Sequence, residues 1–364
     1  MSDSGKYLLV GSTEAYSGKS ATVLGIAFQL IDQGLKMGYG KPLGTCLSEN
    51  TLDDLDEDVR LIADTLNLPP SSLRPTLLSL HSDRIAQRIT GHDQQPYAQL
   101  LQQHYQPTAS EDLVLLEGAG TLNEGQLFGL SMLQMAQILN GPILLVARYH
   151  SPLVVDGLLS AKERLGDRLL GVLINDISPE QMEQATGLVQ PFLEQQGIPV
   201  FGLLPRSQIL RSVSVGELVH HLKAEVLCCR DRLDLMVESL KIGAMNVNSA
   251  LKYFRKAHNM AVVTGGDRTD LQLAALETST HCLILTGQIP PSTTVLQRAE
   301  DLEVPILSVD LDTLTTVEII EHTFGQVRLQ EAVKVQCIRE LMADHFNVTR
   351  FMAALGIEAP MPVG

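Results

Sequence analysis

Residues 11–20 read GSTEAYSGKS and follow a short apolar run at 6–11 that ends in glycine. Apolar residues at helical spacing follow over 21–33, so the stretch lies between an expected strand and an expected helix. This order is typical of a phosphate-binding loop, in which backbone N–H groups and the positive end of the helix surround a di- or triphosphate. Lys19 would reach the outer phosphates, and Ser20 would place its hydroxyl on a magnesium ion.

The loop departs from the usual pattern G-x-x-x-x-G-K-[ST] at one position. Thr13 stands where the first glycine is expected. An ordinary glycine-rich turn with a surface lysine is therefore the alternative, but the order of strand, loop and helix favours phosphate binding. The residues that we expect to contact the nucleotide from this loop are Thr13, Gly18, Lys19, Ser20 and Ala21.

Strand-like and helix-like segments alternate around the loop as far as residue 206. The apolar runs are continuous rather than alternating, which indicates strands covered on both faces. The sequence therefore predicts an α/β unit over 1–206, with a P-loop NTPase-like, doubly wound parallel sheet. The clearest of the later strands are expected at 113–117, 143–147, 169–174 and 200–204.

A second, smaller α/β set follows over 207–328. Its expected strands lie at 226–229, 260–264, 282–286 and 306–309, with helical patterns between them. Residues 334–345 and 348–355 have the pattern of a terminal helical pair. We therefore expect a third segment at 329–364, made of these helices and a tail.

Three further side chains are expected beside the loop. Glu117 ends an apolar strand, and ligands of open parallel sheets lie beyond the carboxyl ends of the strands. Lys41 ends an expected strand at 37–43 and could neutralise a transferred phosphoryl group. Asp58 could bind magnesium through water. The alternatives are a solvated strand-end charge, a surface lysine, and an acidic helix start that the helix dipole favours.

The composition disfavours several classes of function. The chain carries 42 acidic and 27 basic residues, a formal charge of −15, and only 4% aromatic residues without tryptophan. These properties disfavour nucleic-acid and membrane binding. We found no signal-peptide pattern, no apolar run near the roughly 18 residues of a membrane span, and no C-x-x-C spacing among five cysteines. A cytoplasmic location fits best.

The loop, then Lys41 with Pro42, then the Glu-Gly-Ala-Gly run at 117–120, then Asn175 with Asp176 resemble dethiobiotin synthetase in this order. The resemblance implies that ATP and Mg²⁺ are the cofactors, with Ser20, Asp58 and Glu117 at the metal. It implies catalytic roles for Lys19 and Lys41, and that Asn175 contacts adenine. Thr45 matches a hydroxyl position near the substrate. The resemblance also implies a homo-oligomer, a dimer or higher.

Residues 264–270 read TGGDRTD and, with the LTG at 285–287, resemble the DRTGG domain. That domain follows a dethiobiotin-synthetase-like domain in the amino-terminal portion of long-form phosphate acetyltransferase. Since the transferase domain would need several hundred residues beyond Gly364, we do not expect acetyl transfer from this polypeptide. Gly266, Asp267 and Arg268 could bind a metabolite anion, or an Asp–Arg pair could simply fix the turn.

Three functions agree with these features. The first is a regulatory protein that binds ATP and magnesium and senses a metabolite or mediates assembly. The second is an enzyme, an ATPase or an ATP-dependent ligase that acts on a carboxylate or carbamate. The third is a structural interaction protein with a vestigial nucleotide pocket.

Overall fold

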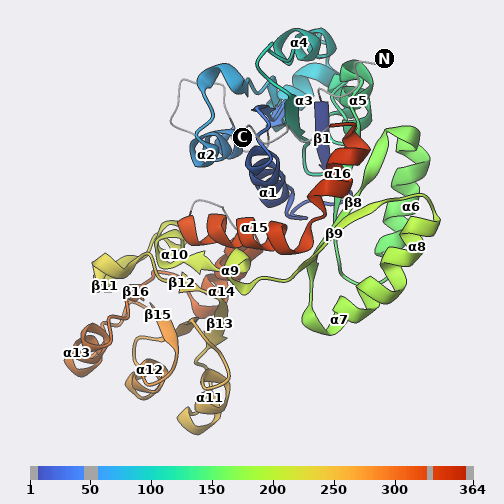
Figure 1. Ribbon diagram of the computed structural model, residues 1–364. Coiled ribbons are helices and arrows are strands. Elements are labelled where there is room, and N and C mark those ends of the chain that lie inside the picture. Colours follow the sequence, from blue (N-terminus) through green and yellow to red (C-terminus); the bar gives the residue numbers. More distant parts are fainter. Residues whose placement is uncertain (1–6, 45–55, 326–330, 358–364) are drawn as a thin grey trace. The chain divides into compact units, whose positions relative to one another are not determined.

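The computed structural model describes residues 7–44, 56–325 and 331–357 of the 364-residue chain, so the expected hydroxyl of Thr45 and the tail at 359–364 lie outside the described residues. The chain divides into unit 1, Met1–Arg206 with Leu329–Gly364, and unit 2, Ser207–Arg328 (Figure 1). The final helices thus belong to the first unit, whereas the sequence had led us to expect a separate segment at 329–364.

Unit 1 is built on a seven-stranded sheet with the order β4-β2-β6-β1-β7-β8-β9. All neighbouring strands are parallel, and the chain begins at the centre with β1 and extends the sheet in both directions. The predicted doubly wound parallel sheet is therefore confirmed. The strands are β1 (Tyr7–Ser12), β2 (Met37–Gly40), β4 (Leu73–Arg74), β6 (Leu113–Glu117), β7 (Ile143–Arg148), β8 (Leu169–Ile177) and β9 (Val200–Pro205).

One expected strand, at 37–43, is divided in the structure. β2 ends at Gly40, and β3 (Leu43–Gly44) pairs instead with β5 (Leu78–Ser79) in a separate two-stranded sheet. Pro42 lies between the two strands and has no N–H to donate to a ladder, which accounts for the interruption.

Helices cover both faces of the large sheet. The helices of unit 1 are α1 (Lys19–Asp32), α2 (Glu57–Leu66), α3 (Ser82–Ile89), α4 (Tyr97–His104), α5 (Met132–Leu139), α6 (Val154–Leu165), α7 (Pro179–Gln184), α8 (Gln190–Gln195), α15 (Ala332–His345) and α16 (Val348–Leu355). Leu9, Val114 and Leu145 share a core with α4, α5 and α6. α1 packs on β1 and β6, and α15 packs on α1 and β9. This burial explains why the strands are apolar throughout.

After unit 2 the chain re-enters unit 1, where close contacts hold α15 and α16 in place. The backbone N–H of Asn347 donates to the carbonyl of Phe201 at 2.8 Å, and Gly202 forms a bridge with Phe346. A β-carbon on Gly25 of α1 would lie 2.3 Å from Cγ of Met342, so α1 and α15 meet where α1 has no side chain. α15 and α16 are thus part of the first unit's core.

Unit 2 is a five-stranded sheet with the order β11-β16-β15-β14-β13, in which only β11 is antiparallel to its neighbour. α11, α12 and α13 pack on one face, and α10 and α14 on the other. The second α/β unit that the sequence predicted is therefore present. The elements are α9 (Gln208–Arg211), β10 (Val213–Ser214), α10 (Val215–Leu222), β11 (Glu225–Cys228), β12 (Met236–Val237), β13 (Ser239–Ile242), α11 (Val247–Phe254), β14 (Met260–Gly265), α12 (Thr269–Leu276), β15 (Thr280–Thr286), α13 (Thr293–Asp301), β16 (Ile306–Ser308) and α14 (Thr313–Gly325).

Within the part of the chain that the structure describes, no helix combines the length and the apolar character that crossing a bilayer requires.

Candidate functional site

The loop between β1 and α1 depends on Gly18. Gly18 has φ +88°, a left-handed conformation that side chains rarely adopt, and it is the residue immediately before α1. A β-carbon there would also lie 2.2 Å from Nδ2 of Asn175. In the described structure no side chain caps this end of α1, and its first turn has no acidic residue. The first N–H groups of α1 are therefore suited to an anion.

Lys19 lies inside the loop rather than on the surface. Its Nζ donates to Oγ of Ser12 at 3.2 Å, and only 8% of the residue is exposed. Burial lowers the pKa of the Lys19 ammonium, although the nearby charge of Glu117 opposes the shift. The alternative of a surface lysine is thus wrong for this residue.

Glu117 lies at the edge of the sheet where the ends of β1 and β6 are neighbours. β1 and β6 are neighbours, with Val10 opposite Glu117, so the carboxylate emerges beside the loop. The hydroxyl of Ser20 donates to Oε1 of Glu117 at 2.7 Å, and the hydroxyl of Tyr39 donates to Oε2 at 2.9 Å. Burial raises the pKa of Glu117, while the positive charge of Lys41 opposes this. Glu117 is buried, so it is not a solvated strand-end charge.

Lys41 belongs to the same cluster but is already paired. Its Nζ contacts Oδ1 of Asp56 at 3.0 Å and Oδ2 of Asp58 at 2.5 Å, and 3% of the residue is exposed. Burial alone would lower the pKa of Lys41, but the carboxylates of Glu117, Asp58 and Asp56 together raise it. The structure thus brings Lys41 and Asp58 together, with Asp58 held by the lysine.

Asp56 belongs to this cluster, although the sequence pattern did not identify it as a site residue. It is the N-cap of α2, where its side chain accepts the backbone N–H of Asp58, and it is fully buried. An aspartate just before an expected helix is a recognised capping signal, so its local role was readable from the sequence. The ion pair of Asp56 with Lys41 could not be read from the sequence.

Asn175 reaches the loop from the end of β8. Its Nδ2 donates to the carbonyl of Ser17 at 3.0 Å, so the structure places this side chain against the loop. The next residue, Asp176, has φ +60° and forms ion pairs with Arg148 and Arg206, both at 2.8 Å. These two arginines were not identified from the sequence, because their pairing depends on the neighbouring ends of β7, β8 and β9.

A cavity of about 240 Å³ lies beside the loop. Thr13 and Glu14 of the loop line it, together with Arg148 at the end of β7, His150 and Ser151 after that strand, and the start of α6. Thr13 is thus placed at the wall of this cavity, whereas Ala21 lies in the first turn of α1.

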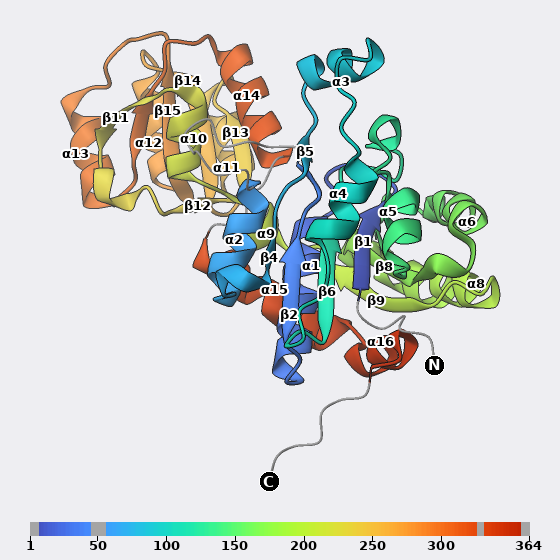
Figure 2. The same ribbon diagram turned by 90° about the horizontal axis from the view of Figure 1, so that it is seen from above.

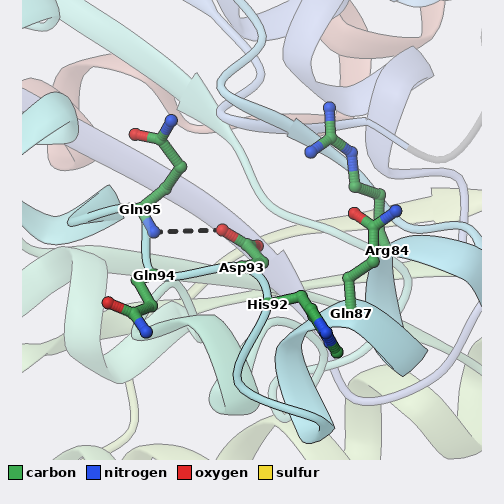
Figure 3. Close-up of a pocket in the computed structure, with 6 residues that line it drawn as sticks. All are labelled: Arg84, Gln87, His92, Asp93, Gln94 and Gln95. Atoms are coloured by element: carbon green, nitrogen blue, oxygen red, sulfur yellow. Dashed lines mark hydrogen bonds between the residues drawn. The ribbon is translucent and has the colours of Figure 1, made fainter.

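A second hollow, of about 370 Å³, lies between α3 and the segment 92–95 that precedes α4 (Figure 3). Its lining is polar and consists of Arg84, Gln87, His92, Asp93, Gln94 and Gln95. The backbone N–H of Gln95 donates to Oδ1 of Asp93 at 3.0 Å, and no residue of the loop at 11–20 lines this hollow. We do not assign the nucleotide to it.

In unit 2, the turn between β14 and α12 is tied to its surroundings. Arg268 donates from Nη2 to the carbonyl of Met245 at 3.1 Å, and its Nε lies 3.4 Å from Oδ1 of Asp270. Gln272 donates to the carbonyls of Gly265 and Gly266. These contacts favour the structural role of the turn, with Asp270 rather than Asp267 as the partner of Arg268. Asp267 itself is exposed.

The donor set beside the loop fits a magnesium ion. Mg²⁺ prefers oxygen ligands, keeps several waters and is usually held by one or two carboxylates together with substrate phosphates. Ser20 and Glu117 present a hydroxyl and a carboxylate 2.7 Å apart. Among the described residues there is no cluster of three or more histidine, cysteine or acidic side chains that could hold a metal by itself. A site here would therefore be completed by phosphate oxygens and water.

Comparisons with curated proteins find relatives along most of the chain. Phosphate acetyltransferase of Synechocystis sp. is 26% identical over 312 residues, covering 81% of this chain and 44% of that protein. Phosphate acetyltransferase of Nitratidesulfovibrio vulgaris is 23% identical over 361 residues, covering 93% of this chain and 50% of that protein. The chain spans about half the length of the curated relatives it matches, and is homologous to their amino-terminal region.

Solved structures give more distant likenesses. The signal recognition particle receptor FtsY from Elizabethkingia anophelis is 13% identical, with a TM-score of 0.38, covering 56% of this chain and 59% of that one. The CBS and DRTGG domains of Clostridium perfringens pyrophosphatase are 17% identical, with a TM-score of 0.29, covering 43% of this chain and 74% of that one.

Two domain families match the two units. The AAA domain matches residues 6–214, and the DRTGG domain matches residues 217–323. The dethiobiotin-synthetase-like and DRTGG resemblances are thereby confirmed. The chain belongs to the AAA domain family through its P-loop unit, and carries a DRTGG domain after it.

Proposed function

We propose that this protein binds ATP together with Mg²⁺ at the loop 11–20 and uses the bound nucleotide as a regulatory signal. The observation that carries the proposal is the 2.7 Å contact between the Ser20 hydroxyl and the Glu117 carboxylate at the start of α1. Hydroxyl, carboxylate, buried lysine and helix N-terminus together provide ligands for a metal and donors for phosphates. Asn175 would face the adenine base.

Regulation is preferred over catalysis because of Lys41. A lysine that assists phosphoryl transfer must offer its positive charge to the reacting group. Here that charge is shared with Asp56 at 3.0 Å and Asp58 at 2.5 Å, and Glu117 adds a third nearby carboxylate. The lysine is thus neutralised by the protein itself. The DRTGG unit would then respond to a metabolite. Substitutions at Gly266, Asp267 and Arg268 test whether this turn binds it in addition to the structural role that its contacts favour.

Calorimetric titration with ATP, in the presence of either Mg²⁺ or EDTA, tests the proposal. The wild-type chain is expected to bind ATP–Mg²⁺ saturably, and Lys19→Ala to lose that binding. Lys36→Ala is the matched control, because Lys36 is an exposed lysine of the same unit. Saturable binding that Lys19→Ala leaves intact would contradict the proposed site. A wild-type thermal midpoint unmoved by saturating ATP–Mg²⁺ would favour the vestigial pocket, since a ligand of the native state must stabilise it.

An ATP-dependent ligase is the second candidate, and the cavity beside the loop favours it. The cavity of about 240 Å³ has Thr13 and Arg148 in its wall, and an acidic substrate there would share Arg148 with Asp176. In such a reaction the γ-phosphoryl group moves to a carboxylate or carbamate oxygen and leaves ADP, and an amine then displaces phosphate. ADP release measured with a panel of small acids and amines tests this. Turnover that depends on one such compound would place catalysis above regulation.

A further inference from the structure

The buried hydroxyl of Tyr39 is bonded to the Glu117 carboxylate. Tyr39 lies on β2 directly opposite Leu115 of β6, two residues before Glu117, so both side chains emerge on the same face of the sheet. Tyr39 is 1% exposed, and its hydroxyl donates to Oε2 of Glu117 at 2.9 Å. A phenol buried at this depth needs such a partner, because an unpaired buried hydroxyl is costly.

The two oxygens of Glu117 have different partners. Oε1 accepts from Ser20 at 2.7 Å, and Oε2 accepts from Tyr39. A serine hydroxyl can turn its lone pair to a metal and release Oε1. The phenol of Tyr39 is buried on β2, between β4 and β6 rather than at the start of α1, and among the described residues its hydroxyl has only Glu117 as a hydrogen-bond partner. Oε2 thus stays occupied while Oε1 faces the start of α1.

We propose that Tyr39 is a positioning residue of the magnesium site, which fixes Glu117 by its Oε2 so that Oε1 is directed to the metal beside Ser20. The inference rests on the proposed function, because it requires nucleotide and metal at this loop. Outer partners of this kind orient metal ligands, and their loss is expected to weaken metal binding by roughly 10-fold or more.

The test compares Tyr39→Phe with Tyr105→Phe. Tyr105 is the matched control, because it is a fully buried tyrosine of the same unit whose hydroxyl donates to a carbonyl, that of Pro75. ATP affinity is measured by calorimetry in EDTA, and the Mg²⁺ concentration for half-maximal thermal stabilisation is measured at saturating ATP. Tyr39→Phe is expected to leave the metal-free affinity within about twofold and to raise the Mg²⁺ requirement roughly 10-fold. Tyr105→Phe is expected to change neither.

A double-mutant cycle separates positioning from a merely structural effect. In a Glu117→Gln background the Tyr39→Phe substitution is expected to have no further effect on the Mg²⁺ requirement, since it acts through the same carboxylate. Equal Mg²⁺ requirements for Tyr39→Phe and wild type would overturn the inference. So would additive effects in the double variant, or a loss of metal-free ATP binding in Tyr39→Phe. If the wild-type chain binds no ATP at all, the proposed function fails first and this inference with it.

Discussion

The hydroxyl of Ser20 lies 2.7 Å from Oε1 of Glu117, although 97 positions separate the two residues along the chain. The contact exists because β1 and β6 are adjacent parallel strands, so that the start of α1 and the end of β6 meet at one edge of the sheet. Substitutions of residues at this edge and elsewhere in unit 1 have predictable effects on stability and ATP binding.

Gly18→Ala is expected to destabilise the protein and to abolish ATP binding. Alanine at φ +88° is strained by roughly 1–3 kcal/mol, and its methyl group would displace Asn175 from the loop. Gly187→Ala is the control, because Gly187 lies in a helical segment and a methyl group added to it would meet no atom within 4 Å. The control is expected to keep binding and stability. Urea unfolding and calorimetry measure both; equal behaviour of the two variants would contradict the role of Gly18.

Lys41→Met is expected to cost roughly 3 kcal/mol of the free energy of unfolding, because it leaves buried carboxylates without their cation. Asp56 is fully buried, so it is the partner most affected. The double variant Lys41→Met with Asp56→Asn is expected to recover part of the loss, as urea unfolding would show. Strict additivity of the two substitutions would show that the pair is not coupled.

Two substitutions at Asp176 distinguish the contribution of its ion pairs to stability from the cost of its left-handed backbone. Asp176→Asn removes the ion pairs with Arg148 and Arg206 but suits the left-handed conformation at φ +60°. Asp176→Ala removes the same pairs and adds a backbone cost of about 1 kcal/mol. Denaturant unfolding is expected to rank wild type above Asp176→Asn and Asp176→Ala lowest. Identical stability of the two variants would exclude a strain term.

The pair Glu194–Arg350 is expected to make α16 sensitive to acid. The hydrogen bond from Arg350 lowers the pKa of Glu194 below its ordinary value of 4.5, with burial opposing. A lowered folded-state pKa stabilises the protein above pH 4.5, and the contribution is lost as the pH falls through the folded pKa. Since both side chains are partly exposed, the effect is about 0.5–1 kcal/mol.

The measurement is urea unfolding of wild type and Glu194→Gln between pH 7 and pH 3. The stability difference between them is expected to shrink as the pH falls. Two parallel profiles over this range would show that the ion pair contributes nothing to folding.

Much of the sheet was predictable because its strands are uniformly apolar. The strand expected at 113–117 and the helix expected at 348–355 have the bounds that the structure shows, because their apolar patterns are clear local signals. α3 was missed for the opposite reason. No residue of α3 is buried, and Figure 2 shows it extending from the rest of unit 1. Its large apolar residues are Ile85 and Ile89, which are too few to form the long apolar period that predicts a helix. β13 is an edge strand of mixed polarity, which also conceals it.

The residues of the candidate site also differ in how far local sequence pattern could predict them. Lys19, Ser20 and Glu117 were predicted together, because each stands at a strand end or helix start that local pattern identifies. Tyr39 was not, since its role depends on β2 lying beside β6, and periodicity does not give the order of strands in a sheet.

The packing of α15 on α1 has a consequence for biosynthesis. Met342 fills the gap that Gly25 leaves, so the outer face of α1 stays bare until the ribosome has made the whole DRTGG domain and the helix after it. At usual rates of roughly 5–20 residues per second, that delay lasts several seconds or more. The nascent first unit is thus exposed to chaperones for that interval, while unit 2 has the opportunity to fold first.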